Sequence, residues 1–156
     1  MVKEIVGFDP AITTPIPGVR MVKTLDELIE ASQIITLHAP YMPSTHHMFG
    51  KEQLAKMQKG SILVNVSRGG LIDENALCDA LNSGHIDGAG LDVFEKEPLQ
   101  ADSPLRSAKN IILTPHIAWY SQSAGRRLVT WALTDVHTFL TGKDTLNGKF
   151  AAGPFN

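Results

Sequence analysis

The stretch SILVNVSRGGLIDENALCDALNSGHIDGAGLDVF, residues 61–94, decides the fold of this protein. It opens with an apolar run (61–67) that predicts a strand. Residues 73–84 predict a helix, because Asp73 is a favourable N-cap residue at its start. A second apolar run (86–94) predicts another strand, and its glycines indicate the close approach of a neighbour. A strand, a helix and a strand at this spacing form a βαβ unit, which predicts a parallel sheet.

The same alternation continues on both sides of this unit. We expect further strands at 4–9, 33–40 and 110–116, and further helices at 24–32, 51–60 and 121–142. Several strands are apolar throughout, which indicates burial on both faces of the sheet. The expected fold class is therefore α/β, a three-layer, doubly wound parallel sheet. We assign residues 1–142 to the domain and the polar, Gly-rich residues 143–156 to a C-terminal tail.

The composition narrows the class of protein. The chain has 156 residues, of which 43% are hydrophobic and 19% charged, with a net charge of -2. These values are ordinary for a soluble globular domain, and they give no reason to expect nucleic acid or a membrane as a partner. Cys78 is the only cysteine, so no internal disulfide is expected and a cytoplasmic location is favoured. No pair of Cys or His residues has zinc-binding spacing, and no metal site is expected.

Side chains that can bind a ligand or do chemistry follow the expected strands: Asp9, His38, Arg68, Glu95 and Glu97, and His116. Because the carboxyl ends of parallel strands share one edge of a sheet, we expect them on one rim, where such folds bind ligands. Plain alternatives exist, since Asp9 is equally a turn former and a lone histidine is more often structural than catalytic. His116 stands apart because a carboxylate and a guanidinium are expected beside it. A carboxylate bonded to an imidazole fixes its tautomer and makes it a usable acid at neutral pH.

Three ordered motifs on this rim resemble one family: VNVSRGGLIDENAL (64–77), GAGLDVFEKEPL (88–99) and NIILTPHIAW (110–119). They are similar to the NAD-binding domain of the D-isomer-specific 2-hydroxyacid dehydrogenases, which include phosphoglycerate, D-lactate and glyoxylate/hydroxypyruvate enzymes. The resemblance extends over residues 4–142. It implies a Rossmann-type domain and the transfer of a hydride between C2 of a 2-hydroxy acid and the cofactor NAD.

The resemblance also implies roles for individual residues. His116 is the expected general acid and base, Glu97 holds its imidazole, and Arg68 binds the carboxylate of the 2-hydroxy or 2-keto acid. Of the other two acids in GAGLDVFEKEPL, Asp92 lies within the expected strand and matches the acid that contacts the nicotinamide carboxamide. Glu95 is expected to be a solvated turn residue.

Positions that match cofactor contacts of the family follow each expected strand. Asp9 matches the acid that binds the adenosine ribose, which favours NAD over NADP because the acid repels a 2′-phosphate. The remaining expected cofactor-binding residues are His38, Ala39, Pro40, Thr45, Val66, Ser67, Arg68, Asp92, His116, Ala118 and Trp119.

One family feature is missing from these 156 residues. The G-x-G-x-x-G loop that cradles the pyrophosphate belongs about 20 residues before Asp9, and the sequence begins only eight residues before it. We therefore expect this chain alone to be an inactive fragment that binds NAD weakly or not at all. Relatives suggest a homodimer formed through the cofactor domain.

Two alternatives to the dehydrogenase remain open at this point. The segment TPHIAWYS (114–121) is similar to the C-terminal-binding-protein corepressors, which implies an NAD(H)-sensing binding protein. In that case Trp119 is a wall of a ligand pocket, whereas packing under the long helix is an equally favoured role. The other alternative is an incomplete domain that persists by self-association.

Overall fold

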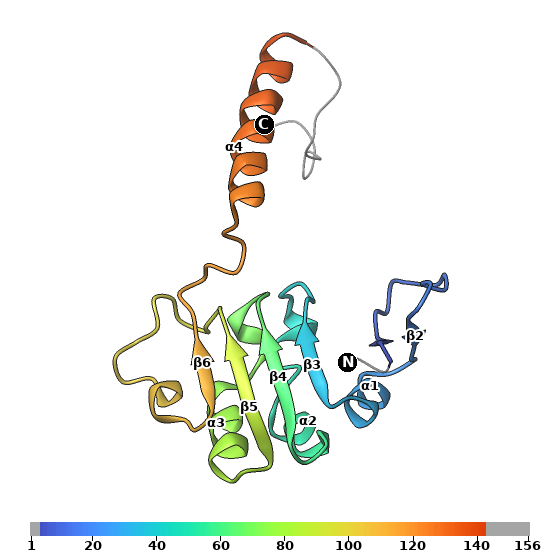
Figure 1. Cartoon of the computed structure of the whole chain (residues 1–156), viewed down its shortest axis with the longest axis vertical. Coiled ribbons are helices and arrows are strands. Elements are labelled where there is room, and N and C mark those ends of the chain that lie inside the picture. The colour runs from blue at the N-terminus through green and yellow to red at the C-terminus, as the bar shows by residue number, and fades with distance from the viewer. Residues whose placement is uncertain (1–3, 143–156) are drawn as a thin grey trace. The chain divides into compact units, whose positions relative to one another are not determined.

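Four parallel strands form the main sheet, in the order β3 (Ile34–Leu37), β4 (Ser61–Asn65), β5 (Ile86–Leu91) and β6 (Ile111–Leu113) (Figure 1). The computed structural model describes residues 4–142. The chain divides into two units, Met1–His116 and Ile117–Asn156, and the sheet belongs to the first. The expected α/β class with a parallel sheet is confirmed, although each strand is shorter than the apolar run that predicted it.

The helices that connect these strands pack against one face of the sheet. They are α2 (Lys51–Lys56), α3 (Glu74–Asn82) and the 3₁₀ turn η3 (Pro104–Ser107). Successive right-handed crossovers in one direction place their helices on the same face. Leu54, Leu63, Leu77 and Leu105 are buried in this layer. Alternate strand residues on the opposite face are exposed in the described structure: Ile34, Ile62 and Ile112. The expected burial on both faces of the sheet is therefore wrong for these strands of the first unit.

Local capping explains where α3 begins and ends. The Asp73 carboxylate accepts hydrogen bonds from the backbone N–H groups of Asn75 and Ala76, both at 3.0 Å, as its sequence position predicts. After the helix, Gly84 has a φ of +73°, a left-handed conformation that glycine adopts without strain. The chain therefore reverses directly into β5.

A small second sheet lies before β3 in the chain. It pairs β1 (Val6–Gly7) with β2 (Arg20–Met21) in parallel, and the helix α1 (Leu25–Ala31) follows. β1 covers two of the six residues expected at 4–9, and β2 was not predicted. The hydroxyl of Thr24 caps α1 by accepting the Glu27 N–H at 3.2 Å.

The second unit contains α4 (Gln122–Leu140), which begins at the N-cap residue Ser121. None of the helices within residues 4–142 combines the length and the apolar character needed to span a bilayer. The expected tail at 143–156 lies outside the described residues, and the expected domain limit at Gly142 stays a prediction.

Candidate active site

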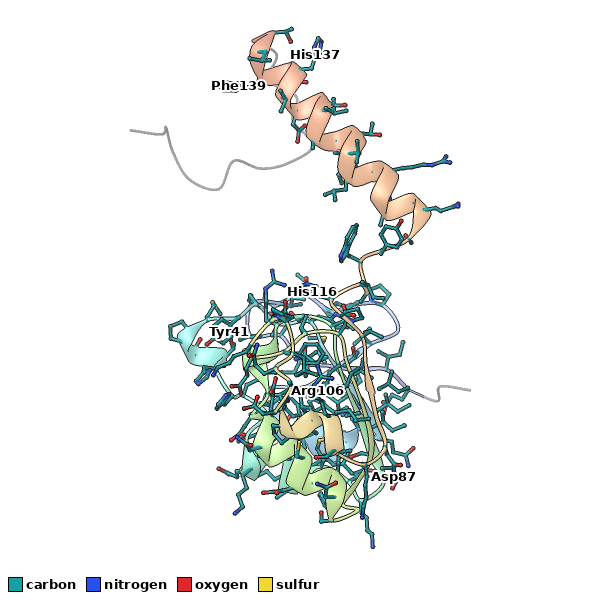
Figure 2. The ribbon with its side chains drawn as sticks, turned by 90° about the vertical axis from the view of Figure 1, so that its left-hand side faces the viewer. Tyr41, Asp87, Arg106, His116, His137 and Phe139 are labelled. Carbon is teal, nitrogen blue, oxygen red and sulfur yellow. The ribbon has the colours of Figure 1, made fainter. Side chains whose placement is uncertain are left out.

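The expected site residues that follow strands of the main sheet gather at its carboxyl edge, whereas Asp9 follows β1 of the separate two-stranded sheet and is not on this edge. The residues that directly follow β3, β4, β5 and β6 are His38, Val66, Asp92 and Thr114, respectively. Figure 2 shows His116 and Tyr41 at one end of the first unit and Asp87, from the start of β5, at the other. This edge is the place where open parallel sheets bind ligands.

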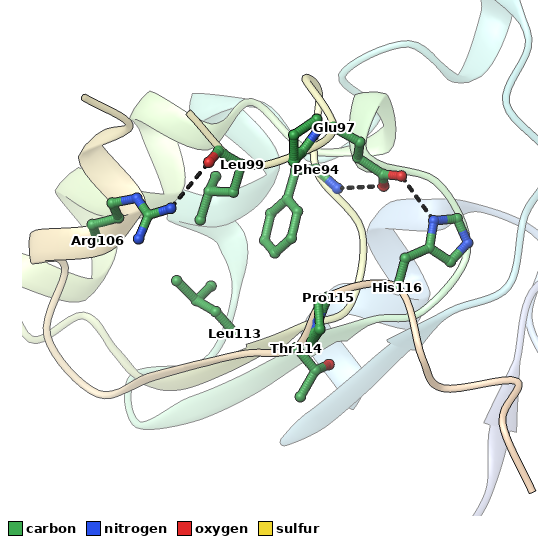
Figure 3. A pocket seen from close by; sticks show the side chains of 9 residues that line it. Phe94, Glu97, Leu99, Arg106, Leu113, Thr114, Pro115 and His116 are labelled. Carbon is green, nitrogen blue, oxygen red and sulfur yellow. Dashed lines mark hydrogen bonds and ion pairs between the residues drawn. The ribbon is translucent and has the colours of Figure 1, made fainter. Parts of the chain in front are cut away.

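His116 and Glu97 form a hydrogen-bonded pair on this edge. His116 Nδ1 lies 2.8 Å from Glu97 Oε2, and the Phe94 N–H donates to Glu97 Oε1 at 3.1 Å (Figure 3). Both oxygens of the carboxylate are therefore held by groups of the protein. His116 has a φ of +56°, which is uncommon for a residue with a side chain and is found more often at functional sites.

The surroundings of Glu97 favour its charged form. The hydrogen bond with His116 lowers the pKa of Glu97, and the Phe94 N–H and the charge of Arg68 act in the same direction against partial desolvation. An ionised carboxylate only accepts hydrogen bonds, so the bonded Nδ1 of His116 carries a proton. This arrangement orients the imidazole for proton exchange through Nε2.

Arg68 is placed by a tight turn after β4. The buried Asn65 side chain accepts the Ser67 N–H at 3.1 Å and donates to the Arg68 carbonyl at 2.9 Å. The Ser67 hydroxyl also donates to the Ala39 carbonyl at 2.7 Å, which ties this turn to the segment after β3. The side chain of Arg68 therefore extends from a backbone segment that these hydrogen bonds fix. Its positive charge contributes to the lowered pKa of Glu97.

Asp92 follows β5 directly instead of lying within the strand as expected. The Asp92 N–H donates to the Asn65 carbonyl at 3.0 Å, directly after the last residue pair of β4 and β5. The side chain is buried and accepts a hydrogen bond from the Thr114 hydroxyl. A buried carboxylate at the strand ends can accept a hydrogen bond from the amide group of a ligand. The expected contact of Asp92 with the nicotinamide carboxamide stays a prediction.

Three of the other expected cofactor residues of the first unit bond to groups close to them in the chain. Asp9 is exposed after β1, and its carboxylate accepts the Ala11 N–H at 2.8 Å. His38 Nε2 lies 2.9 Å from the Thr36 hydroxyl. The Thr45 hydroxyl donates to the Pro40 carbonyl at 2.8 Å and shapes the segment between them. Asp9 therefore forms a turn in this structure, which is the alternative role given for it above.

Ala118 and Trp119 belong to the second unit, whose placement relative to the first is not determined. The Trp119 ring contacts Tyr120 edge to face, with 5.3 Å between the ring centroids. Their expected contacts with the cofactor therefore stay predictions.

A cavity of about 500 Å³ opens beside the His116–Glu97 pair. Its apolar wall includes Phe94, Leu99 and Leu113 (Figure 3). Arg106 closes one side, where its guanidinium donates to the Leu99 carbonyl at 3.0 Å. The acid/base pair thus borders a cavity that is mostly apolar.

Glu95 lies in an exposed bend, as expected, but it also has bonded partners that were not predicted. Its Oε1 lies 2.8 Å from His47 Nε2, and its N–H donates to Glu74 Oε1 at 2.8 Å. Sequence reasoning missed His47 and Glu74, because their partner lies 48 and 21 residues away in the chain and no local pattern marks the contact. The loop of residues 94–97 therefore holds two acids, each bonded to an imidazole.

A parallel sheet with an imidazole–carboxylate pair and an arginine at its carboxyl edge is typical of α/β domains that bind a ligand at that edge. Comparison with known families is more specific. The model for "D-isomer specific 2-hydroxyacid dehydrogenase, NAD binding domain" matches residues 3–118, and the chain belongs to this family.

Individual relatives agree with this family. The chain is 48% identical over 118 residues to a hydroxypyruvate reductase from Blautia hydrogenotrophica, covering 76% of this chain and 37% of the relative. It is 42% identical over 143 residues to a D-3-phosphoglycerate dehydrogenase from Methanocaldococcus jannaschii, covering 90% of this chain and 27% of the relative. The structure is similar to that of a D-lactate dehydrogenase with NAD+ from Lactobacillus jensenii, with a TM-score of 0.83, 30% identity and coverage of 94% and 48%.

The chain thus spans well under half the length of these curated relatives. The names of these relatives are those of dehydrogenases and reductases, and they give no support to the corepressor alternative. The resemblance, the cofactor class NAD and the oxidoreductase class expected from the sequence are confirmed at the level of the family.

Proposed function

We propose that this chain is the NAD-binding part of an oxidoreductase that transfers a hydride between C2 of a 2-hydroxy acid and NAD. The single observation that carries the proposal is the 2.8 Å bond between His116 and Glu97 at the carboxyl edge of the sheet. The positive charge of Arg68 also lowers the pKa of the Glu97 carboxyl, which supports a cation near the acid/base pair.

His116 is the proposed catalytic acid and base. In the reduction of a 2-keto acid, it donates a proton from Nε2 to the C2 oxygen, and in the oxidation of the hydroxy acid it accepts that proton. Glu97 holds Nδ1 and stabilises the imidazolium form from which the proton leaves. A positioned acid of this kind contributes about 10²–10⁴-fold to rate.

Arg68 is proposed to bind the substrate carboxylate. A guanidinium forms two parallel hydrogen bonds with a carboxylate, and its positive charge also polarises the neighbouring C2 oxygen. The turn built on Asn65 fixes the backbone from which Arg68 extends. The substrate is therefore a small acid whose carboxylate is adjacent to the reacting carbon.

The residues on this edge suit NAD in their donor chemistry. The buried Asp92 offers an acceptor for the carboxamide, and Val66 and Ser67 follow β4 on the same edge. The exposed Asp9, which follows β1 of the second sheet, offers an acceptor for ribose hydroxyls. When bound, NAD supplies the hydride acceptor or donor. The negative charge of Asp9 is the proposed basis for a preference for NAD over NADP.

Thermal unfolding of this chain with added NAD tests the expectation that it binds NAD weakly alone, since a ligand that binds only the folded state raises the melting temperature. We also propose that the protein is cytoplasmic and forms a homodimer through this domain. Analytical ultracentrifugation of the chain tests whether it is a dimer.

The function itself is tested by turnover of a panel of 2-keto acids with NADH, using the gene product that carries this chain. We expect at least one acid to be reduced, and His116→Ala to lose most of the activity while remaining folded. If none is reduced, or if His116→Ala turns over like the parent, the proposed function is wrong.

A further inference from the structure

A second imidazole–carboxylate pair lies next to the first in the same loop. His47 Nε2 and Glu95 Oε1 are 2.8 Å apart, and each side chain is about one third exposed, at 34% and 37%. Glu95 lies two residues before Glu97. A contact that fixes Glu95 therefore acts on the backbone that presents Glu97 to His116.

The backbone of Glu95 is held as firmly as its side chain. Its N–H donates to Glu74 Oε1 at 2.8 Å, and Glu74 sits in the first turn of α3. On another side, the Phe94–Glu95 peptide packs directly on Gly69, where an added Cβ would lie 1.9 Å from the Phe94 carbonyl carbon. The segment is thus attached to α3 and to the 3₁₀ turn η2 (Gly69–Leu71).

His47 is itself attached to η2. Its N–H donates to the Gly70 carbonyl at 2.8 Å, and two residues later the Phe49 N–H donates to the Leu71 carbonyl at 3.0 Å. The His47 ring stacks on His46, with 3.8 Å between the centroids. The imidazole that holds Glu95 therefore extends from backbone bonded to the segment that follows Arg68.

We refer to Glu74, His47 and Glu95 together as the brace. The Phe94 N–H, which holds Glu97 Oε1, and the Glu95 N–H, which the brace holds, belong to adjacent peptide units. Movement of the Glu95 N–H therefore disturbs the bond from the Phe94 N–H to Glu97.

We propose that the brace positions the Glu97 carboxylate for its bond with His116. Its members are positioning residues, because they are proposed to act on His116 through Glu97. The kinetic part of this inference rests on the proposed function, but the geometry of the pair does not. The competing interpretation is an ordinary surface ion pair, which contributes only about 0–1 kcal/mol and leaves Glu97 unaffected.

Paired variants of this 156-residue chain distinguish these interpretations. Glu95→Gln and Glu74→Gln keep an oxygen acceptor at each position, whereas Glu95→Ala and Glu74→Ala remove it. Glu52→Ala is the matched control, since it removes another exposed 2.8 Å ion pair, with Lys56 on α2. The readouts are the NMR titration of the Glu97 carboxyl and the tautomer of the His116 imidazole.

We expect both alanine variants to move the Glu97 titration up toward the ordinary value of 4.5 and to weaken the preference for a protonated Nδ1 on His116. The two glutamine variants and the control should resemble the parent. An unchanged Glu97 titration in folded alanine variants overturns the proposal. If Glu74→Ala does not fold, Glu95→Ala and His47→Ala decide the question, because both side chains are partly exposed.

Kinetics of the gene product separate this inference from the proposed function. If both hold, Glu95→Ala lowers kcat by roughly ten- to a hundred-fold, with little change in KM, and Glu95→Gln restores it. If the parent reduces no 2-keto acid while the Glu97 titration still responds to the brace, the proposed function fails and the positioning role stands.

Discussion

Replacement of Gly69 by alanine is expected to destabilise the protein and displace the loop that carries Glu97. A Cβ at this position would lie 1.9 Å from the carbonyl carbon of Phe94, 2.1 Å from its oxygen and 2.4 Å from the nitrogen of Glu95. Ordinary contacts between carbon atoms are about 3.5–4.0 Å, so the two backbones must separate by roughly 1.5 Å or more. No side-chain rotation relieves this contact, because all three neighbouring atoms are backbone.

Overpacking of this kind typically costs about 1–3 kcal/mol, and because backbone lies on both sides we expect a cost of about 3 kcal/mol for Gly69→Ala. For a chain of this size, that loss lowers the melting temperature by about 6–12 °C. Thermal unfolding followed by circular dichroism measures the change. Gly90→Ala is the control, since no atom lies within 4 Å of its added Cβ. If Gly69→Ala melts at the same temperature as Gly90→Ala, the close packing of η2 on the 94–95 peptide is refuted.

Three further predictions concern the site. Arg68→Lys keeps the charge but loses the two-pronged geometry, so KM for the keto acid should rise by about ten-fold or more in steady-state assays; an unchanged KM argues against a carboxylate contact. The lowered pKa of Glu97 means that its bond stabilises the fold above the unfolded-state pKa and that this contribution is lost as pH falls through the folded value. Glu97→Gln should therefore reduce the free energy of unfolding at neutral pH, by no more than about 1 kcal/mol for so exposed a pair, and the difference should vanish in acid; denaturant titrations at several pH values measure it. Asp9→Asn retains an acceptor for the Ala11 N–H but removes the charge, so the preference for NADH over NADPH in kcat/KM should fall by about ten-fold or more; an unchanged ratio places the discrimination elsewhere.

The helix α3 and the rim of polar residues could be predicted from the sequence because the signals are local. Asp73 caps the helix through N–H groups two and three residues away. The rim follows from the rule that parallel strands end at one edge, which needs only the order of the elements. The strand β2 has two residues, which is too short to show any periodicity.

Contacts between distant segments could not be predicted in this way. The spacing of acids in GAGLDVFEKEPL does not show whether Glu95 or Glu97 faces His116, and the family resemblance alone selected Glu97. The bond between Glu95 and His47 joins residues 48 apart, and it depends on how the segment after β3 runs along η2. The same limit applies to Asp92 and Thr114, whose contact requires the final register of β5 and β6.

Transfer of a labelled hydride tests the proposed reaction most directly. The gene product that carries this chain is incubated with a 2-keto acid and NADH deuterated at its transferable nicotinamide position, and the product is analysed by mass spectrometry and chiral chromatography. We expect one deuterium at C2 of the D-2-hydroxy acid, with the yield strongly reduced in His116→Ala. A hydroxy acid without deuterium at C2, or the same yield from His116→Ala, would contradict the proposed function.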